Sequence, residues 1–193
     1  MKLDKNLEPF RSAIEALNRL ILKYENRGAV IGGVAVSLLG KPRYTADVDA
    51  VFLLYSENLP QFFEDARAEA IVPRMKNAED FARKNRVLLL QHEPSKTLID
   101  ISMGTPPFEE EMVARATYQS FSNLSIRLPT PEDLIVMKAV AHRPKDTEDI
   151  RSIVNKNPNL DTAYIESWIR FFAEALYAPD LWEEIRNILE NKE

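Results

Sequence analysis

The chain changes character at residues 128–133, where the sequence LPTPED contains two prolines. Before this point, runs rich in β-branched and aromatic residues alternate with segments of helical period, whereas after it every segment has helical period. A chain that keeps its strands in one part and ends in helices is typical of an α+β fold. We therefore predict a mixed β-sheet with flanking helices in residues 1–129, followed by a C-terminal helical bundle in residues 130–193.

The same patterns predict the individual elements. Strands are expected in residues 28–33, 47–55, 86–93, 96–104, 115–121 and 124–130, of which 86–104 and 115–130 each suggest a strand pair. Helices are expected in residues 7–24, 34–40, 59–70, 78–85, 131–143, 146–156, 161–177 and 179–192. The start signals of five of these helices are Pro60, Pro131, Asp146, Asp161 and Pro179.

The composition limits the possible chemistry. A chain of 193 residues can bury a sizeable core, and the absence of cysteine excludes disulfides, thiolate metal sites and a cysteine nucleophile. The N-terminal residues lack the pattern of a signal peptide, and no window approaches the roughly 20 apolar residues that a membrane span needs. We therefore expect a cytoplasmic protein with no membrane partner.

The formal charge of −5 is unevenly distributed. Residues 160–193 carry eight acidic and three basic residues, which leaves residues 1–159 balanced at 22 of each. The acidic balance disfavours broad electrostatic binding to nucleic acid, but it leaves room for a focused contact.

Two aspartates, Asp47 and Asp49, lie one residue apart in the apolar run DVDAVF. Alternate residues of a strand share a face, so both carboxylates point the same way. Two carboxylates about 4 Å apart repel by on the order of 4 kcal/mol at an effective dielectric of 20, a cost that a bound cation offsets. Because the available ligands are oxygens and histidine is scarce, the pattern points to Mg²⁺ or Mn²⁺ rather than zinc.

A third aspartate, Asp100, lies between two isoleucines in another predicted strand. Three aspartates on strands can hold two metal ions that align an attacking hydroxyl with a nucleoside triphosphate. Gly32 and Gly33 lie at a predicted turn from strand to helix, where backbone N–H groups can bind phosphate and glycine permits close approach.

These residues resemble the nucleotidyltransferase signature of the polymerase β superfamily. The stretch GGVAVSLLGKPRYTADVD resembles AbiEii-type and MenT-like toxin nucleotidyltransferases more closely, and the segment LIVMKAVAHRPKDTEDIRSIV resembles a later motif of the same proteins and of small antibiotic-modifying nucleotidyltransferases. The three similar segments fall within residues 32–153. The resemblance implies a nucleotidyltransferase-like mixed sheet.

The resemblance also implies roles for single residues. It implies that Gly32 and Gly33 bind the triphosphate, and that Asp47, Asp49 and Asp100 bind the metals. Asp100 is also the candidate general base. Many members of the superfamily have Gly-Ser where this chain has Gly-Gly, so that a hydroxyl contact to phosphate is absent here.

Four further positions match the motifs. The resemblance implies that Lys138 contacts the triphosphate, that Arg43 and Thr45 shape the nucleotide site, and that Asp146 lies near the catalytic centre. Its toxin branch implies an RNA acceptor, such as a tRNA 3′ end, and an antitoxin protein as partner.

Structural interpretations remain open for these residues. Asp47 can begin a strand, Asp49 can be a charge on an edge strand, and Asp100 can follow a hairpin turn. Lys138 can be a solvated lysine and Asp146 an N-cap. The basic loop at Lys41 and Arg43 can be solvated, or it can hold triphosphate or pair with Asp47. Two more sets have a structural interpretation only: His92 and His142 without a role, and an aromatic core formed by Trp168, Phe171, Phe172, Leu176 and Trp182.

Two other functions also remain open. The chain can be a nucleotidyltransferase that modifies a small molecule such as an antibiotic, which the acidic balance favours for a cationic substrate. It can also be a nucleotide-binding protein of the same fold without catalysis. An Asp100 that points away from Asp47 and Asp49 would favour the latter.

Overall fold

The computed structural model describes residues 6–191. The chain forms two compact units: the first comprises the described part of Met1–Val34 together with Arg43–Pro129, and the second Ala35–Pro42 together with the described part of Thr130–Glu193. The division into domains at residues 129 and 130 stays a prediction. No helix within residues 6–191 is both long and apolar enough to cross a membrane.

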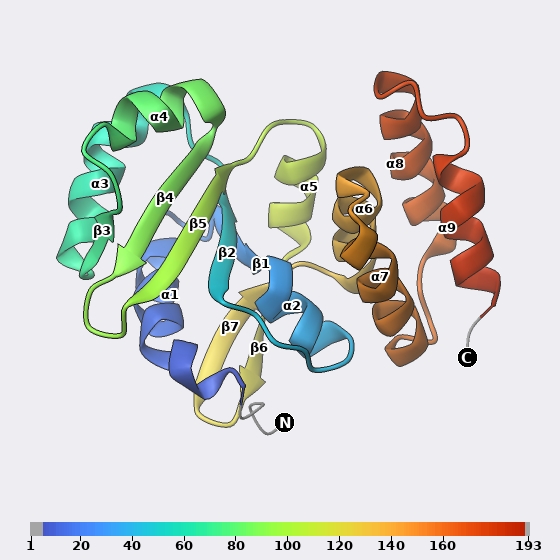
Figure 1. The fold of residues 1–193 in the computed structure, drawn as a ribbon, viewed down its shortest axis with the longest axis horizontal. Helices are drawn as coiled ribbons and strands as arrows, with labels where there is room; N and C mark the ends of the chain where they lie inside the picture. The colour runs from blue at the N-terminus through green and yellow to red at the C-terminus, as the bar shows by residue number, and fades with distance from the viewer. Residues whose placement is uncertain (1–5, 192–193) are drawn as a thin grey trace. The chain divides into compact units, whose positions relative to one another are not determined.

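The first unit is built on a five-stranded mixed sheet with strand order β1-β2-β5-β4-β3 (Figure 1). Its strands are β1 (Gly28–Ile31), β2 (Asp47–Phe52), β3 (Ile71–Pro73), β4 (Val87–His92) and β5 (Thr97–Met103). The pairing of β2 with β5 is parallel, whereas the other pairings are antiparallel.

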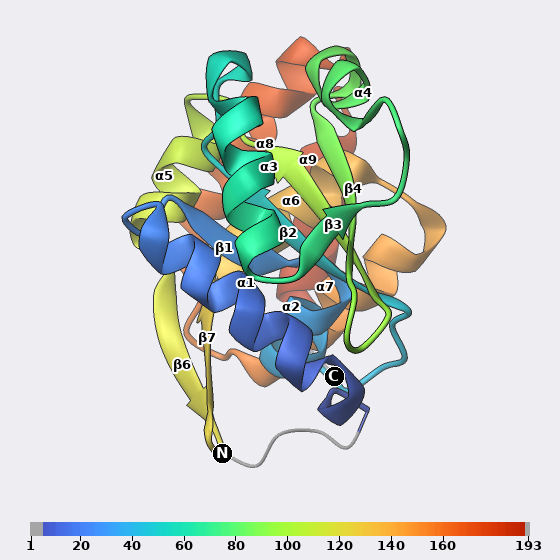
Figure 2. The ribbon, with the colours of Figure 1, turned by 90° about the vertical axis from the view of Figure 1, so that its left-hand side faces the viewer.

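The central strands β2, β4 and β5 each bury one face. In β5, the side chains of Ile99 and Ile101 are buried, while Leu98, Asp100 and Ser102 are half-buried on the opposite face. The helices α1 (Arg11–Lys23) and α3 (Leu59–Ala68) lie against one face of the sheet (Figure 2). The polar residues of β2 and β5 are therefore on the face that the sheet core does not use.

The first unit also contains several helices and a second, two-stranded sheet. The helices are η1 (Glu8–Phe10), η2 (Ser56–Asn58), α4 (Ala78–Asn85) and α5 (Phe108–Arg115). A separate antiparallel hairpin, β6 (Thr117–Phe121) with β7 (Leu124–Leu128), packs through β7 against β1 and α1. The helix α2 (Gly32–Leu39) follows β1 directly and begins with the two glycines.

The second unit is helical. It contains α6 (Pro131–Ala141), α7 (Pro144–Lys156), α8 (Thr162–Ala175) and α9 (Leu181–Glu190), of which α6 packs against α7 and α8, and α9 against α7 and α8. Residues near the end of α7 hold the end of α2: the Lys156 ammonium donates to the carbonyl oxygens of Leu38 (2.8 Å) and Gly40 (3.0 Å).

The predicted α+β class is confirmed, with a mixed sheet followed by helices. Both predicted strand pairs are present, at β4–β5 and β6–β7. The start signals at Pro131 and Asp161 are also confirmed: Pro131 is the first residue of α6, and the Asp161 carboxylate accepts the N–H of Tyr164 at the start of α8. The predictions missed β3 and α5.

Several predictions of detail are wrong. α7 begins at Pro144 rather than at Asp146, and α9 begins at Leu181 rather than at Pro179. The aromatic set of the second unit is not all core: Trp182 is buried, but the side chains of Phe171 and Leu176 are exposed. Phe171 lies off the buried stripe of α8, which carries Ile165 and Ile169, and Leu176 follows the last residue of this helix.

Candidate active site

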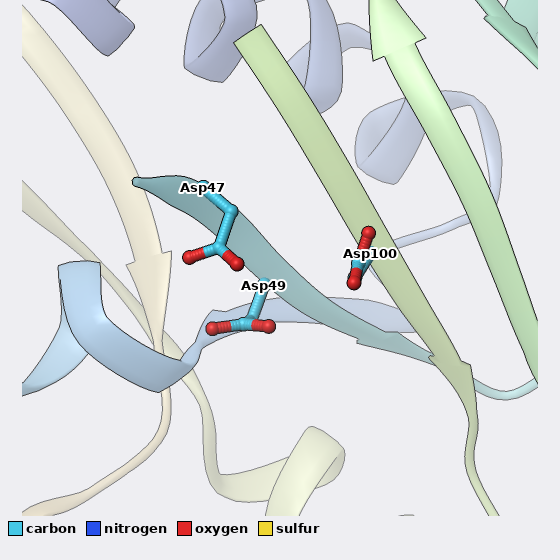
Figure 3. Close-up of side chains that lie close together, drawn as sticks. All are labelled: Asp47, Asp49 and Asp100. Atoms are coloured by element: carbon cyan, nitrogen blue, oxygen red, sulfur yellow. The ribbon is translucent and has the colours of Figure 1, made fainter. Parts of the chain in front are cut away.

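Three carboxylates converge on the half-exposed face of the sheet in the first unit. Asp47 and Asp49 project from β2, and Asp100 projects from β5 to the same side (Figure 3). One carboxylate oxygen of each lies within 4.8 Å of those of the other two. The parallel register pairs Asp49 with Asp100, which explains why residues 51 positions apart meet. The structure therefore brings together the three aspartates that the sequence analysis singled out.

Gly32 lies directly against this cluster. It joins β1 to α2 with φ of +62°, a left-handed conformation that glycine adopts without strain. A Cβ atom at this position would overlap the carboxylate of Asp49. Ile31, the preceding residue, is paired with Asp49 across β1 and β2. Glycine is therefore required here both by the turn and by the close approach of the carboxylate.

The second glycine lies beside the loop that leads into β2. A Cβ atom at Gly33 would overlap the Thr45 side chain and would lie 3.4 Å from the Arg43 guanidinium. The Thr45 hydroxyl donates to the carboxylate of Asp47 (3.1 Å) and to its carbonyl oxygen (3.2 Å). Thr45 thus fixes the first aspartate, and Arg43 brings a positive charge close to the start of α2.

Asp100 has a distinct electrostatic environment. Its carboxylate forms an ion pair with the Arg74 guanidinium. Burial raises the pKa of Asp100 above its ordinary value; Arg74 lowers this pKa, and the negative charge of Asp47 raises it further, with a net upward shift. A raised pKa makes this carboxylate a stronger base than a fully solvated aspartate.

The donor set fits a hard divalent cation. Mg²⁺ and Mn²⁺ prefer oxygen ligands, and the three converging carboxylates supply oxygens from two rigid strands. The absence of a side chain at Gly32 leaves the Asp49 carboxylate room beside the backbone. The acidic triad can therefore bind metal.

Arg74 is the residue of this site that sequence reasoning missed. It follows the three-residue strand β3, which is too short for alternation to reveal. Its position depends on the order β5-β4-β3, a long-range property of the sheet. The local sequence contains no signal for its approach to Asp100.

The two remaining predicted site residues, Lys138 and Asp146, lie in the second unit. The Lys138 ammonium is buried and contacts the carboxylates of Asp146 (2.8 Å) and Asp149 (2.9 Å). The solvated interpretation of Lys138 is therefore wrong. Arg143 donates to Asp146 from its side chain (2.7 Å) and its backbone N–H (3.1 Å). The roles of Lys138 and Asp146 in catalysis stay predictions.

The position of Asp146 also corrects its structural interpretation. The N-cap of α7 is Arg143, and Asp146 is the third helical residue, whose carboxylate accepts the N-cap N–H. Burial acts to raise the pKa of Asp146, but the hydrogen bonds from Arg143 and Lys138 outweigh it and lower this pKa to about 2. Asp146 is therefore ionised at neutral pH.

The other structural interpretations have mixed outcomes. Asp47 does begin β2, as expected of a strand-starting aspartate. Asp49 is not on an edge strand, because β2 lies between β1 and β5. His142 does have a partner, since its Nε2 lies 2.9 Å from the Glu184 carboxylate. His92 likewise contacts the Ser95 hydroxyl at 2.8 Å, within the β4–β5 hairpin.

Solved structures share this fold. An antigenic nucleotidyltransferase-like protein from Paracoccidioides brasiliensis is similar with a TM-score of 0.56 and 16% sequence identity, and 93% of each chain is covered. The antibiotic-resistance factor ANT(2'')-Ia is similar with a TM-score of 0.54 and 13% identity, over 88% of this chain and 95% of the other. No curated protein matches the sequence closely enough to count as a relative.

A family model matches residues 6–169 and is described as "Nucleotidyltransferase of unknown function (DUF6036)". The matched residues contain all three aspartates and both glycines of the site. Because the match spans most of the chain, the protein belongs to this family of nucleotidyltransferases.

Proposed function

We propose that the protein is a metal-dependent nucleotidyltransferase that transfers a nucleoside monophosphate from a nucleoside triphosphate to a hydroxyl group and releases pyrophosphate. The convergence of Asp47, Asp49 and Asp100 is the observation that carries this proposal. A protein that only bound nucleotide would have no need for a third carboxylate from another strand, whose charge adds repulsion. Membership in a nucleotidyltransferase family supports the same reaction class.

The proposed reaction assigns a role to each candidate site residue of the first unit. Asp47, Asp49 and Asp100 hold Mg²⁺ or Mn²⁺, which supplies Lewis acidity to the hydroxyl and to the α-phosphate. The backbone at Gly32 and Gly33 binds the triphosphate at the start of α2, with Arg43 as a neighbouring positive charge. Thr45 keeps the carboxylate of Asp47 in place.

The bonds change in one displacement. The acceptor oxygen attacks the α-phosphorus, and the bond from this phosphorus to the oxygen that bridges to the β-phosphate breaks, so that pyrophosphate leaves. In this proposal Asp100 accepts the proton of the acceptor hydroxyl as general base.

The resemblance of the later motif supports roles for two residues of the second unit. Lys138 contacts the triphosphate in this proposal. Asp146 is a positioning residue, because its carboxylate holds the Lys138 ammonium at 2.8 Å.

For the acceptor we propose RNA, such as a tRNA 3′ end, with the protein acting as the toxin of a toxin–antitoxin pair. The motif GGVAVSLLGKPRYTADVD, which resembles toxin nucleotidyltransferases, supports this assignment. The alternative acceptor is a cationic small molecule such as an antibiotic. The acidic balance of the chain favours that acceptor, and the structural neighbour ANT(2'')-Ia is an antibiotic-resistance factor.

Labelled triphosphates test both the reaction and the acceptor. The protein is incubated with Mg²⁺, each of the four triphosphates, and either total RNA or a panel of aminoglycosides. Label in the α-phosphate is expected to enter RNA, whereas label in the γ-phosphate is expected to leave with pyrophosphate. The matched control is Asp49→Asn, which keeps the shape of the side chain and removes its charge.

Each other outcome has a definite meaning. If label enters an aminoglycoside instead of RNA, the proposed RNA acceptor is wrong but the proposed nucleotidyl transfer stands. Transfer of γ-label to an acceptor would identify a phosphotransferase and overturn the proposal. Triphosphate binding without transfer to any acceptor would favour a non-catalytic nucleotide-binding protein.

A further inference from the structure

A row of residues paired across neighbouring strands leads from the carboxylate cluster to the edge of the sheet at β3. Asp49 is paired with Asp100 between β2 and β5, and Asp100 with Leu89 between β5 and β4. Beyond Leu89, the backbone N–H of Arg74 donates to the Leu89 carbonyl oxygen at 3.0 Å, directly after β3. Figure 1 shows these four strands side by side. Arg74 therefore lies on the same row as two of the three aspartates.

The side chain of Arg74 spans the intervening strand. Neighbouring strands lie about 4.8 Å apart, so that Arg74 and Asp100 are separated by on the order of 10 Å of backbone. The ion pair between their side chains closes this gap. The exposed fractions of the two side chains are 25% for Arg74 and 33% for Asp100, so that both remain accessible to solvent and to ions.

The carboxylate that Arg74 contacts is one that a metal would need. Its guanidinium donates to Oδ1 of Asp100, and Asp100 is one of the three residues whose carboxylates converge to within 4.8 Å. Mg²⁺ binds oxygen at about 2.0–2.1 Å and demands near-octahedral geometry, which leaves little tolerance for a second cation at the same carboxylate. A guanidinium and a metal ion therefore compete for this carboxylate.

We propose that Arg74 is a resident cation at Asp100, and that a divalent metal must displace it from this carboxylate to occupy the site fully. Arg74 is thus a positioning residue, which holds Asp100 in place until the metal binds. This inference rests on the proposed function, because it assumes that the three aspartates are metal ligands.

Metal affinity tests the inference without any transfer assay. Mn²⁺ binding to the full chain is measured by electron paramagnetic resonance for the wild type, Arg74→Ala and Arg74→Lys. Because Arg74→Ala removes a positive charge next to the cluster, we expect it to bind Mn²⁺ about tenfold more tightly. Arg74→Lys keeps the charge, so its affinity is expected to return to within about twofold of the wild type.

A matched variant separates this effect from a general change in charge. Arg83 lies on the surface of α4 and forms an exposed ion pair with Glu79 at 2.7 Å, so Arg83→Ala removes the same charge from the same unit. Its Mn²⁺ affinity is expected to equal that of the wild type. A second readout is the guanidinium ¹⁵N signal of Arg74, which is expected to shift when Mg²⁺ is added.

The outcomes distinguish this inference from the proposed function. If the wild type binds Mn²⁺ but Arg74→Ala behaves like Arg83→Ala, the inference is overturned and the metal site stands. If the wild type binds no Mn²⁺, both the inference about Arg74 and the proposed metal site are contradicted. Tighter binding by Arg74→Ala together with an unshifted Arg74 signal would also overturn the displacement.

Discussion

In the first unit, three like charges gather on a half-exposed face of the sheet, whereas in the second unit Lys138 lies buried between the two carboxylates of Asp146 and Asp149. The second cluster is balanced by its own side chains, since Arg143 adds a further positive charge. The first gathers three carboxylates, of which Asp100 is paired with Arg74. The second cluster therefore links α6 to α7 through its own charges, whereas the metal site proposed for the first needs a cation from outside.

The largest expected effect comes from Asp49→Asn in the first cluster. Loss of this charge is expected to lower the rate of nucleotidyl transfer by on the order of 1,000-fold. The metal would lose a ligand, and the negative charge that develops on the α-phosphate would be less well stabilised. The free energy of unfolding without metal is expected to stay the same or rise slightly, because a repulsion is removed. Label transfer and urea unfolding measure the two effects. A large loss of stability would mean that the first cluster is structural too.

Lys138→Met should, unlike Asp49→Asn, lower the stability of the second unit. Removing one partner of a buried ion pair leaves uncompensated charges, which costs about 3–5 kcal/mol of stability. Both tryptophans of the chain, Trp168 and Trp182, lie in the second unit, so tryptophan fluorescence in urea follows its unfolding. The matched control is Lys145→Met at an exposed position of α7. A loss no larger than that of the control would contradict the structural role.

The stability of the second unit is expected to fall in acid. The pKa of Asp146 is lowered to about 2 from its ordinary value of 3.8, so its ionised form stabilises the folded state above pH 3.8. This contribution, on the order of 2 kcal/mol, is lost as the pH falls from about 4 to about 2. Urea midpoints from tryptophan fluorescence across this range measure the loss. In Asp146→Asn the same decline should be shallower, and an unchanged slope would exclude Asp146 as its source.

Gly32→Ala should cost less stability than the loss of the Lys138 charge. A residue with a side chain at φ of +62° costs about 1–2 kcal/mol, and the added carbon would also press on the Asp49 carboxylate. Thermal unfolding and Mn²⁺ affinity measure the two consequences. Gly104→Ala is the control, because φ is not left-handed there and the neighbouring atoms belong to side chains. Equal Mn²⁺ affinity for both variants would show that Gly32 does not support the cluster.

The parts of the site that the sequence could predict are those with a local signal. Asp47 and Asp49 are two residues apart, so the period of a strand alone places them on one face. Asp100 was predicted because an acid between two isoleucines in a strand is unusual. Its register with Asp49 required the sheet order, which no local pattern contains.

The parts that the sequence could not predict depend on contacts between distant segments. Arg74 reaches Asp100 only because β4 lies between β3 and β5. The burial of Lys138 could not be predicted, because its own helix carries no sign of its partners, which lie on the next helix. β3 and α5 were missed because three residues are too few to show alternation and because FEEEMVAR has few apolar residues at helical spacing.

The parallel pairing of β2 with β5 has a consequence for how the protein is made. A ribosome releases Asp47 and Asp49 well before Asp100, and a parallel pair cannot close as a simple hairpin. A nascent chain that ends before residue 97 carries two of the acids but lacks the strand that brings the third. The three carboxylates therefore cannot meet until β5 has inserted between β2 and β4, so the proposed site exists only once translation has passed this strand.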